Sequence, residues 1–231
     1  MKKFKEEFKT MHGVFDEFTN RTIFKLISQH HFDGLIGPIS LGKEAVVFQA
    51  KKDNEKVSVK VYRLETCDFN RMYDYLKYDP RFKVKRGKRN IIFTWAQREY
   101  RNLLKAREAN VSAPKPISIE NNVLVMEFIG NENPAPKLKD SEIKNPKEFF
   151  DEIIKNIKRL YKAELVHTDL SQFNILNHHQ RPVFIDFSQC TSLENPNFKE
   201  YLERDIRNII IFFERFNLKL DEKKIKEKII E

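Results

Sequence analysis

The stretch LVHTDLSQFNIL at residues 165–176, followed by FIDFS at residues 184–188, carries the clearest pattern in the sequence. It contains H-x-D-x-x-x-x-N, formed by His167, Asp169 and Asn174, and then an Asp-Phe pair that begins at Asp186. Each polar group stands beside a short apolar run. Polar side chains held at fixed spacing on apolar segments indicate a rigid group of oxygen atoms rather than ordinary turn residues.

The residue types in this pattern suit phosphoryl transfer. A divalent cation that holds a triphosphate prefers hard oxygen ligands, which the Asn174 amide and the Asp186 carboxylate provide. A further carboxylate without metal, here Asp169, would orient an acceptor hydroxyl and take its proton. The spacing is that of kinase catalytic and metal-binding loops. The sequence therefore predicts Asp169 as the catalytic carboxylate and Asn174 and Asp186 as metal ligands.

Lys60 lies inside the apolar run 57–62, which is expected to be a strand. A buried ammonium group without a partner is costly, whereas phosphate oxygens would make this lysine an anchor. Glu99, on a helix predicted at 94–109, is the candidate that holds Lys60, as in the Lys–Glu pair of kinases. The sequence also allows an edge-strand lysine whose ammonium reaches solvent.

The segment ISLGKEA at residues 39–45 predicts a tight turn over phosphates. It has a single glycine, so it is neither a three-glycine kinase loop nor a G-x-x-x-x-G-K-[ST] motif. Gly42 would allow close backbone approach to a triphosphate. Ser40 and Lys43 are candidate phosphate contacts, although Lys43 could equally point to solvent.

Hydrophobic periodicity and turn residues predict a sheet-rich half followed by a helix-rich half. The predicted helix at 4–32 has Thr19 as its N-cap, and Asn145 is the N-cap of a later helix. The remaining predicted elements are strands at 35–41, 45–50 and 57–62, an irregular stretch at 66–92, the helix at 94–109, strands at 117–119 and 123–128, extended pieces at 166–177 and 182–187, and a final helix around 201–213.

This order favours an α+β, two-lobed fold. It lacks the strand–helix alternation and the G-x-G-x-x-G motif of a dinucleotide-binding domain. We expect a helical extension at 1–38, an N-lobe at 39–130 and a C-lobe at 131–231.

Composition narrows the choice of compartment and partner. The 231 residues carry 43 Lys and Arg against 34 Asp and Glu, a net charge of +9, which favours contact with polyanions such as nucleotides or RNA. The alternative explanation of the positive charge is an ordinary solvent-exposed surface that is rich in lysine. With only Cys67 and Cys190, no disulfide framework is expected. We expect a cytoplasmic protein with no membrane or DNA partner.

Two charged clusters have alternative interpretations. His30, His31 and Asp33 could suggest a metal site, but adjacent histidines point in different directions on a helix, so a helix-end or surface role is favoured. Residues 81–89 hold six cations and no acid. Their composition favours a mobile loop over an RNA or phosphate contact.

Together these motifs resemble the RIO family of atypical protein kinases, in particular its Rio-one branch. The resemblance runs from about residue 12 to 216. The shared motifs are SLGKEAVVF at 40–48, VKVYR at 59–63, DPRF at 79–82, WAQREYRNL at 95–103, VMEFIG at 125–130, PAPKLKD at 134–140, LVHTDLSQFNIL at 165–176 and FIDFSQ at 184–189.

The resemblance implies a minimal protein-kinase-like fold without an activation segment or peptide-docking helices. It implies a serine/threonine protein kinase that uses ATP with Mg2+, or with Mn2+, and that also hydrolyses ATP through an aspartyl-phosphate on Asp186. It further implies a role in maturation of the small ribosomal subunit, with an RNA-rich pre-ribosomal partner and a protein substrate that the sequence does not name. The implied ATP contacts are Ser40, Lys60, Glu127 and Ile129, the last two from the hinge.

Two positions depart from the common kinase pattern. Ser171, a candidate contact near the nucleotide, stands two residues after Asp169, where most protein kinases carry a lysine. One fewer cation at the transferring phosphate should slow transfer. No Ser or Thr occurs from Cys67 to Phe93, so the loop serine that relatives can phosphorylate is missing there.

Two other functions remain open on sequence alone. Small-molecule kinases of the aminoglycoside or choline type share H-x-D-x-x-x-x-N, but usually have a larger helical lobe. A non-catalytic RNA-binding scaffold would bind RNA with a steep salt dependence and would not bind nucleotide.

Overall fold

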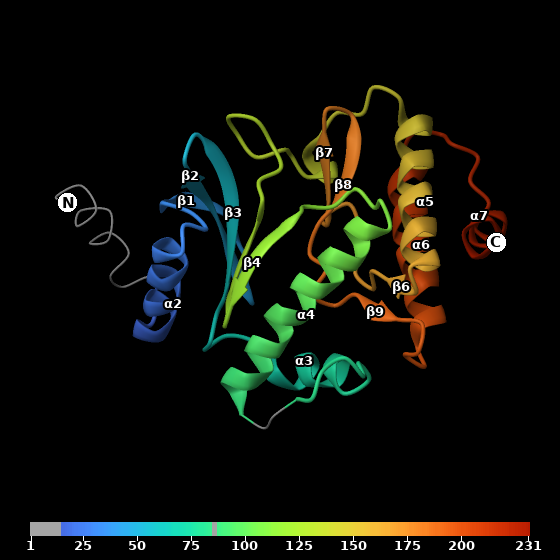
Figure 1. Ribbon diagram of the computed structural model, residues 1–231. Coiled ribbons are helices and arrows are strands. Elements are labelled where there is room, and N and C mark those ends of the chain that lie inside the picture. The colour runs from blue at the N-terminus through green and yellow to red at the C-terminus, as the bar shows by residue number, and fades with distance from the viewer. Residues whose placement is uncertain (1–14, 85–86) are drawn as a thin grey trace.

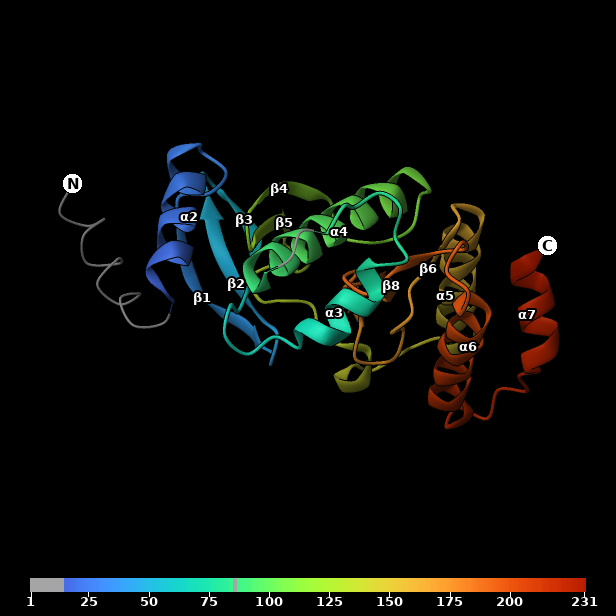
Figure 2. The same ribbon diagram turned by 90° about the horizontal axis from the view of Figure 1, so that it is seen from below.

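The computed structural model describes residues 15–84 and 87–231. Figure 1 shows a sheet covered by α2 on the left, the long helices α5 and α6 on the right, and α4 running obliquely between them. Figure 2 shows the same order from below, with α3 beside α4. No helix in these ranges is long and apolar enough to cross a bilayer.

The sheet has five antiparallel strands in the order β1-β2-β3-β5-β4. They are β1 (Gly34–Leu41), β2 (Ala45–Lys52), β3 (Glu55–Tyr62), β4 (Pro116–Glu120) and β5 (Val123–Glu127). The three-strand meander and the later hairpin were predicted within two residues at each end. Since β3 pairs with both β2 and β5, it is a central strand.

Alternate residues of β3 face opposite sides of the sheet. Val57, Val59 and Val61 pack in one apolar cluster with Ile23 and Leu26 of α2. Lys60 and Tyr62 therefore face the other side, toward α4. Because β3 has neighbours on both edges, the alternative of an edge-strand lysine that reaches solvent is wrong; Lys60 is only 6% exposed.

Helix α2 spans Glu17–Ser28. Its N-cap is Asp16, whose carboxylate accepts hydrogen bonds from Thr19 N (3.1 Å) and Thr19 Oγ1 (2.7 Å). The prediction of Thr19 as the N-cap was therefore wrong by one turn. The Asp16 carboxylate accepts the hydrogen bond of a first-turn N–H that has no partner within the helix. The predicted helix begins at residue 4, which lies outside the described residues.

The stretch 66–92 contains more regular structure than predicted. Helix α3 covers Phe69–Leu76, with Asp68 as its N-cap and Met72 and Leu76 buried. Helix α4 covers Lys88–Glu108, so it starts six residues earlier than expected. Arg81, assigned by composition to a mobile loop, donates to Asp79 and Asn102. The hydrogen bonds of Arg81 therefore fix its position, although the composition of residues 81–89 favoured a mobile loop.

The second lobe is mainly helical. Its long helices are α5 (Pro146–Lys162), with the predicted N-cap Asn145, and α6 (Phe198–Glu214). A last helix, α7 (Glu222–Ile230), packs against both and was not predicted. The smaller elements are the 3-10 turn η1 (Leu138–Asp140), the pair β6 (Leu165–Val166) with β9 (Thr191–Ser192), and the hairpin β7 (Ile175–His178) with β8 (Arg181–Phe184).

Candidate active site

Lys60 stands at the centre of the candidate site. Its Nζ lies 2.9 Å from Glu99 Oε1 and 2.9 Å from Asp186 Oδ1, and Glu99 also accepts a hydrogen bond from the Tyr62 hydroxyl. Burial disfavours the charged lysine, but the two carboxylates outweigh it and raise the pKa of Lys60. Because Lys60 is on β3, Glu99 on α4 and Asp186 in the helical lobe, one ammonium group joins three parts of the molecule.

Asp186 follows β8 and has a φ of 63°, in the left-handed region that non-glycine residues rarely adopt. Its Oδ1 accepts from both Lys60 Nζ and Ser188 Oγ (2.7 Å). Burial alone would raise the pKa of this carboxyl, but Lys60 lowers it to about 2. Asp186 is therefore ionised at neutral pH.

The loop before Asp169 is held in an unusual conformation. Thr168 has a φ of 69°, which is unfavourable for a β-branched residue. Asp205 on α6 accepts from Thr168 N (2.8 Å) and Leu170 N (2.9 Å), Thr168 Oγ1 donates to Gln189 O (3.0 Å), and Arg204 donates to Thr168 O. Several bonds thus fix the backbone on both sides of Asp169.

Asp169 and Asn174 are in direct contact. Asn174 Nδ2 donates to both the backbone oxygen (2.8 Å) and Oδ2 (3.0 Å) of Asp169. Burial and the nearby Asp186 charge raise the pKa of Asp169, while the hydrogen bond from Asn174 opposes that rise. A carboxylate with a raised pKa is better suited to accept a proton.

The oxygens of Asn174 and Asp186 fit a hard divalent cation. Because the side-chain nitrogen of Asn174 donates to Asp169, the side-chain oxygen points away from Asp169. The backbone oxygen of Asn174 accepts from Ile185 N (3.0 Å), and this bond keeps the two loops together. Asp186 Oδ2 takes part in no hydrogen bond among the described residues. Mg2+ commonly takes one or two protein ligands and completes its shell with phosphate oxygens and water.

No set of three or more His, Cys, Asp or Glu side chains in the described ranges could hold a metal alone. His31 and Asp33 have partners within the protein. His31 Nε2 lies 3.2 Å from Ser118 Oγ, and Asp33 accepts from Asp53 N.

The turn between β1 and β2 lies at one end of the sheet. Gly42 N donates to Ala45 O (2.9 Å), and a Cβ on Gly42 would come within 2.9 Å of that same oxygen, so only glycine fits without a shift. Lys43 is exposed, Ser40 is half-buried, and Glu44 is close enough to Asp186 for the two charges to raise the pKa of Glu44, after the larger effect of burial.

The predicted hinge residues follow β5. Glu127 side-chain Oε2 accepts from Lys115 N (2.9 Å), so its carboxylate has a structural partner. Ile129 is 9% exposed, and its carbonyl accepts from Ala135 N (2.9 Å). The Ile129 N–H has no hydrogen-bond partner among the described residues, which leaves a backbone donor for an adenine ring. Ser171 is half-buried beside the catalytic loop, and its carbonyl accepts from Asn174 N (3.0 Å).

Sequence reasoning assigned no role to the residues that join α4 to the segment after Asp186. Arg98 Nη1 donates to Ser188 O (3.0 Å), and Asn102 Nδ2 donates to Phe187 O (3.0 Å) and Cys190 O (2.9 Å). Both side chains are fully buried, and Asp79 accepts from Arg98 Nε (3.1 Å). The sequence signal for this role was the four-residue spacing of Arg98 and Asn102, which places two polar side chains on one face of a helix that is otherwise packed.

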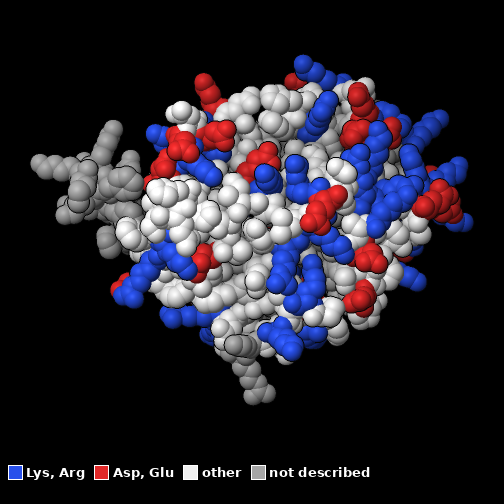
Figure 3. Space-filling model, viewed as in Figure 1, with Lys and Arg blue, Asp and Glu red and all other residues white. Residues whose placement is uncertain are grey.

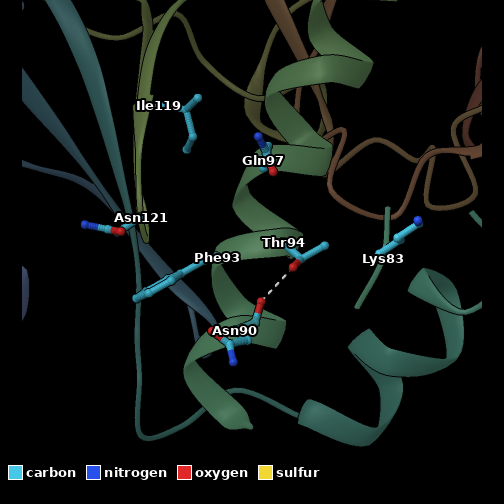
Figure 4. A pocket seen from close by; sticks show the side chains of 7 residues that line it. All are labelled: Lys83, Asn90, Phe93, Thr94, Gln97, Ile119 and Asn121. Atoms are coloured by element: carbon cyan, nitrogen blue, oxygen red, sulfur yellow. Dashed lines mark hydrogen bonds between the residues drawn. The ribbon is translucent and has the colours of Figure 1, made fainter. Parts of the chain in front are cut away.

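A separate pocket lies on the far side of α4 from this site. Figure 4 shows Phe93 and Gln97 of α4 on the side of Ile119 and Asn121, at the end of the β4–β5 hairpin. Thr94 points toward Lys83, and its hydroxyl donates to Asn90 O. Helical spacing places Glu99 on the opposite face of α4. The pocket therefore shares a helix with the candidate site but no residue.

Comparison with known proteins identifies the family. A family model described as the RIO domain matches residues 46–226. This chain belongs to the RIO family. RIO-type serine/threonine-protein kinases named Rio1 match most of it: 45% identity over 217 residues for the protein of Methanocaldococcus jannaschii (93% of this chain, 74% of the relative), and 38% over 186 residues for that of Thermoplasma acidophilum (80% and 98%).

The fold agrees with that of a RIO kinase of known structure. The Rio2 kinase–ADP/Mg2+–phosphoaspartate complex from Chaetomium thermophilum superposes with a TM-score of 0.70 at 22% identity, over 91% of this chain and 66% of that one. The predicted RIO resemblance and the two-lobed, kinase-like α+β fold are therefore confirmed. The chain is a serine/threonine kinase of the RIO type, which is an ATP-dependent kinase family.

Proposed function

We propose that this RIO kinase binds ATP with Mg2+ between its lobes and transfers the γ-phosphoryl group to a serine or threonine hydroxyl. The observation that supports this most is the convergence of Lys60, Asp169, Asn174 and Asp186, which come from opposite ends of the chain. A small-molecule kinase would share these groups, but the relatives are named as protein kinases. A scaffold without catalysis leaves the ionised Asp186 and the Lys60–Glu99 pair unexplained.

The residues have separate roles in this proposal. Lys60, positioned by Glu99, holds phosphate oxygens, and the turn with Ser40, Gly42 and Lys43 covers them. The backbone at Glu127 and Ile129 binds the adenine ring, with Ser171 near the phosphates. When bound, Mg2+, or Mn2+ in its place, would be held by Asn174 and Asp186 and would neutralise charge on the phosphates. Asp169 orients the acceptor hydroxyl and accepts its proton.

The test compares Asp169→Asn and Asp186→Asn with Asp74→Asn, which changes an exposed carboxylate on α3 that pairs with Lys77. Labelled ATP and casein as a general acceptor report transfer, and titration calorimetry reports nucleotide binding. Asp169→Asn should bind ATP normally and lose about 1,000-fold or more in transfer, as expected for removal of a catalytic base whose loop also orients the acceptor. Asp186→Asn should lose Mg2+-dependent binding. Full transfer by either variant would exclude the proposal.

We further propose that Asp186 is itself a transient phosphoryl acceptor, which would make the protein an ATPase as well. Two features support this: its Oδ2 has no hydrogen bond among the described residues, and its low pKa keeps it ionised. A RIO kinase of the same fold has been described as a phosphoaspartate complex. An acyl phosphate is cleaved by hydroxylamine, whereas a serine phosphate is not. Label from ATP on the wild-type chain that resists hydroxylamine would exclude the acyl phosphate.

The proposed partner is an RNA-rich precursor of the small ribosomal subunit in the cytoplasm. The net charge of +9 supports a polyanionic partner, and Figure 3 shows Lys and Arg side chains gathered over the helical lobe. Sedimentation of the protein with small ribosomal particles, in ATP and in ADP, tests this. An association that differs between ATP and ADP would support a role for ATP hydrolysis in timing the release of the protein from the particle. Absence from the particles in both nucleotides would exclude it.

A further inference from the structure

The candidate site is rich in carboxylates and poor in free cations. Asp169 and Glu44 each lie within electrostatic reach of Asp186, whose charge raises the pKa of both after the larger effect of burial. Lys60 is already shared between Glu99 and Asp186. The catalytic loop has Ser171 rather than a lysine two residues after Asp169. A cation from another element would add to the charge stabilisation that Lys60 and the proposed Mg2+ give the transferring phosphoryl group.

Arg71 of α3 contacts the segment that follows Asp186. Its Nη2 donates to Gln189 Oε1 (3.0 Å), three residues beyond Asp186, and the backbone oxygen of Gln189 accepts from Thr168, the neighbour of Asp169. The positive charge of Arg71 opposes the rise in pKa of both Asp169 and Glu44. The guanidinium is thus within electrostatic reach of the catalytic carboxylate and of the turn that covers the phosphates.

Helix α3 directs this side chain toward the segment that follows Asp186. Asp68 caps the helix by accepting from Arg71 N, and Met72 and Leu76 anchor its other face in the core. Arg71 is exposed, and its one side-chain hydrogen bond within residues 15–84 and 87–231 is to the neutral amide of Gln189. A guanidinium has five N–H donors, so most of its capacity remains for an incoming anion.

The other cations near Asp169 among the described residues are less suitable. Arg204 donates to Thr168 O and lies over the ring of Tyr201, so it is engaged in holding the loop. Lys139 lies over the ring of Phe173, 5.3 Å from its centre. Neither of these two cations affects the pKa of Glu44, which Arg71 and Lys60 lower.

We infer that Arg71 contacts the transferring phosphoryl group and supplies the positive charge that the catalytic loop lacks. In the transfer, the bond from the γ-phosphorus to the ADP oxygen breaks, a bond forms from the acceptor hydroxyl oxygen to that phosphorus, and the hydroxyl proton passes to Asp169. Arg71 stabilises the equatorial oxygens while this occurs. The inference rests on the proposed role of Asp169, and it makes α3 part of the catalytic machinery.

The experiment compares Arg71→Ala and Arg71→Lys with Lys77→Ala, which removes the same charge from the end of the same helix, where Lys77 pairs with Asp74. Transfer to casein and hydrolysis of ATP are measured separately, each with kcat and KM. Arg71→Ala should lower kcat of both reactions by about 100-fold, the scale of one lost charge-stabilising donor, with KM for ATP nearly unchanged. Arg71→Lys should keep part of the rate, and added guanidinium ion should partly restore Arg71→Ala.

Each contrary result has a distinct meaning. A raised KM for casein with normal ATP hydrolysis would make Arg71 an acceptor-binding residue and overturn the inference. Equal losses in Arg71→Ala and Lys77→Ala, or a lowered melting temperature without guanidinium rescue, would make its effect structural and overturn it too. If Asp169→Asn kept full activity, the proposed function itself would fail. If Asp169→Asn were inactive and Arg71→Ala normal, only the role of Arg71 would fail.

Discussion

At the scale of single residues, the site depends on charges that are buried and fully paired. The Lys60 side chain is 8% exposed and Glu99 is 1% exposed, so each needs the other. Breaking a buried pair leaves an uncompensated charge, whereas an exposed pair contributes little because solvent screens it. The same residue that is proposed to hold phosphate therefore also stabilises the junction between β3 and α4.

Lys60→Met is expected to lower the free energy of unfolding by about 3 kcal/mol, because Glu99 is left buried without a cation. The double variant Lys60→Met, Glu99→Gln should recover part of that loss, since the unpaired charge is removed. Urea denaturation of the single and double variants measures both effects. Lys25→Met, which breaks an exposed pair with Glu120, is the control and should change stability by less than about 1 kcal/mol. A double variant less stable than Lys60→Met would contradict the pairing argument.

Asp205 gives a prediction that depends on pH. Its burial raises the pKa to about 7, although two backbone amides favour the ionised form. Because the folded pKa exceeds the unfolded value, its stabilising contribution is complete below about pH 4 and is lost as pH rises through about 7. Asp205→Asn cannot ionise. The stability gap between wild type and Asp205→Asn, measured by urea denaturation, should therefore narrow from pH 5 to pH 8. A gap that stays constant over this range would show that Asp205 is ionised throughout it.

At the scale of elements, α4 carries two functions on one face. Glu99 holds Lys60, while Arg98 and Asn102 hold the segment that follows Asp186. A shift of α4 would thus disturb Lys60 and the segment that follows Asp186 together. Asp79 and Arg81, in the connection before α4, reinforce this junction through Arg98 and Asn102.

Asn102→Ala tests this coupling. It removes three hydrogen bonds, one of them donated by Arg81, and leaves the carbonyls of Phe187 and Cys190 buried without a donor, which should cost about 2–3 kcal/mol. Because Asp186 precedes that segment, the concentration of Mg2+ needed for half-maximal activity should also rise. Denaturation and a Mg2+ titration measure the two effects. Asn70→Ala, at an exposed position of α3, is the control. A stability loss with unchanged Mg2+ dependence would show that the segment is held without Asn102.

At the scale of the whole molecule, the ion pair between Lys60 and Asp186 joins the two lobes. The described residues form three apolar clusters, and the largest extends from α5 and α6 to Leu103, Ala106 and Leu124 of the first lobe. A ligand that binds both lobes should therefore stabilise the entire chain.

ATP with Mg2+ at 100 times its Kd should stabilise the protein by about 2.7 kcal/mol, because binding occurs only in the folded state. The shift should appear in thermal denaturation and be lost on adding EDTA. AMP, which lacks the β- and γ-phosphates, should stabilise less at the same concentration. Equal stabilisation by AMP, or by ATP in Asp186→Asn, would place the nucleotide away from the proposed metal ligands.

Local sequence patterns were enough to predict the meander, the later hairpin, the N-cap at Asn145 and the kinase-like order of elements. These features depend on neighbours in the chain, namely alternation of apolar residues, turn residues and capping side chains. The spacing from Asp169 to Asn174 likewise indicated one short loop. Helix α3 and the cap at Asp16 were missed because packing and a specific hydrogen bond, rather than propensity, decided them.

The tertiary structure alone decided which distant groups meet. Lys60 is 126 positions from Asp186, and Arg71 is 118 from Gln189, so no local pattern links either pair. It also decided that β3 is central, which buries Lys60 and makes a carboxylate partner necessary. The sequence determined the chemistry of each group because residue type sets charge and hydrogen-bonding capacity. Folding determined the site, because the distances that make those charges act together arise only when the lobes pack.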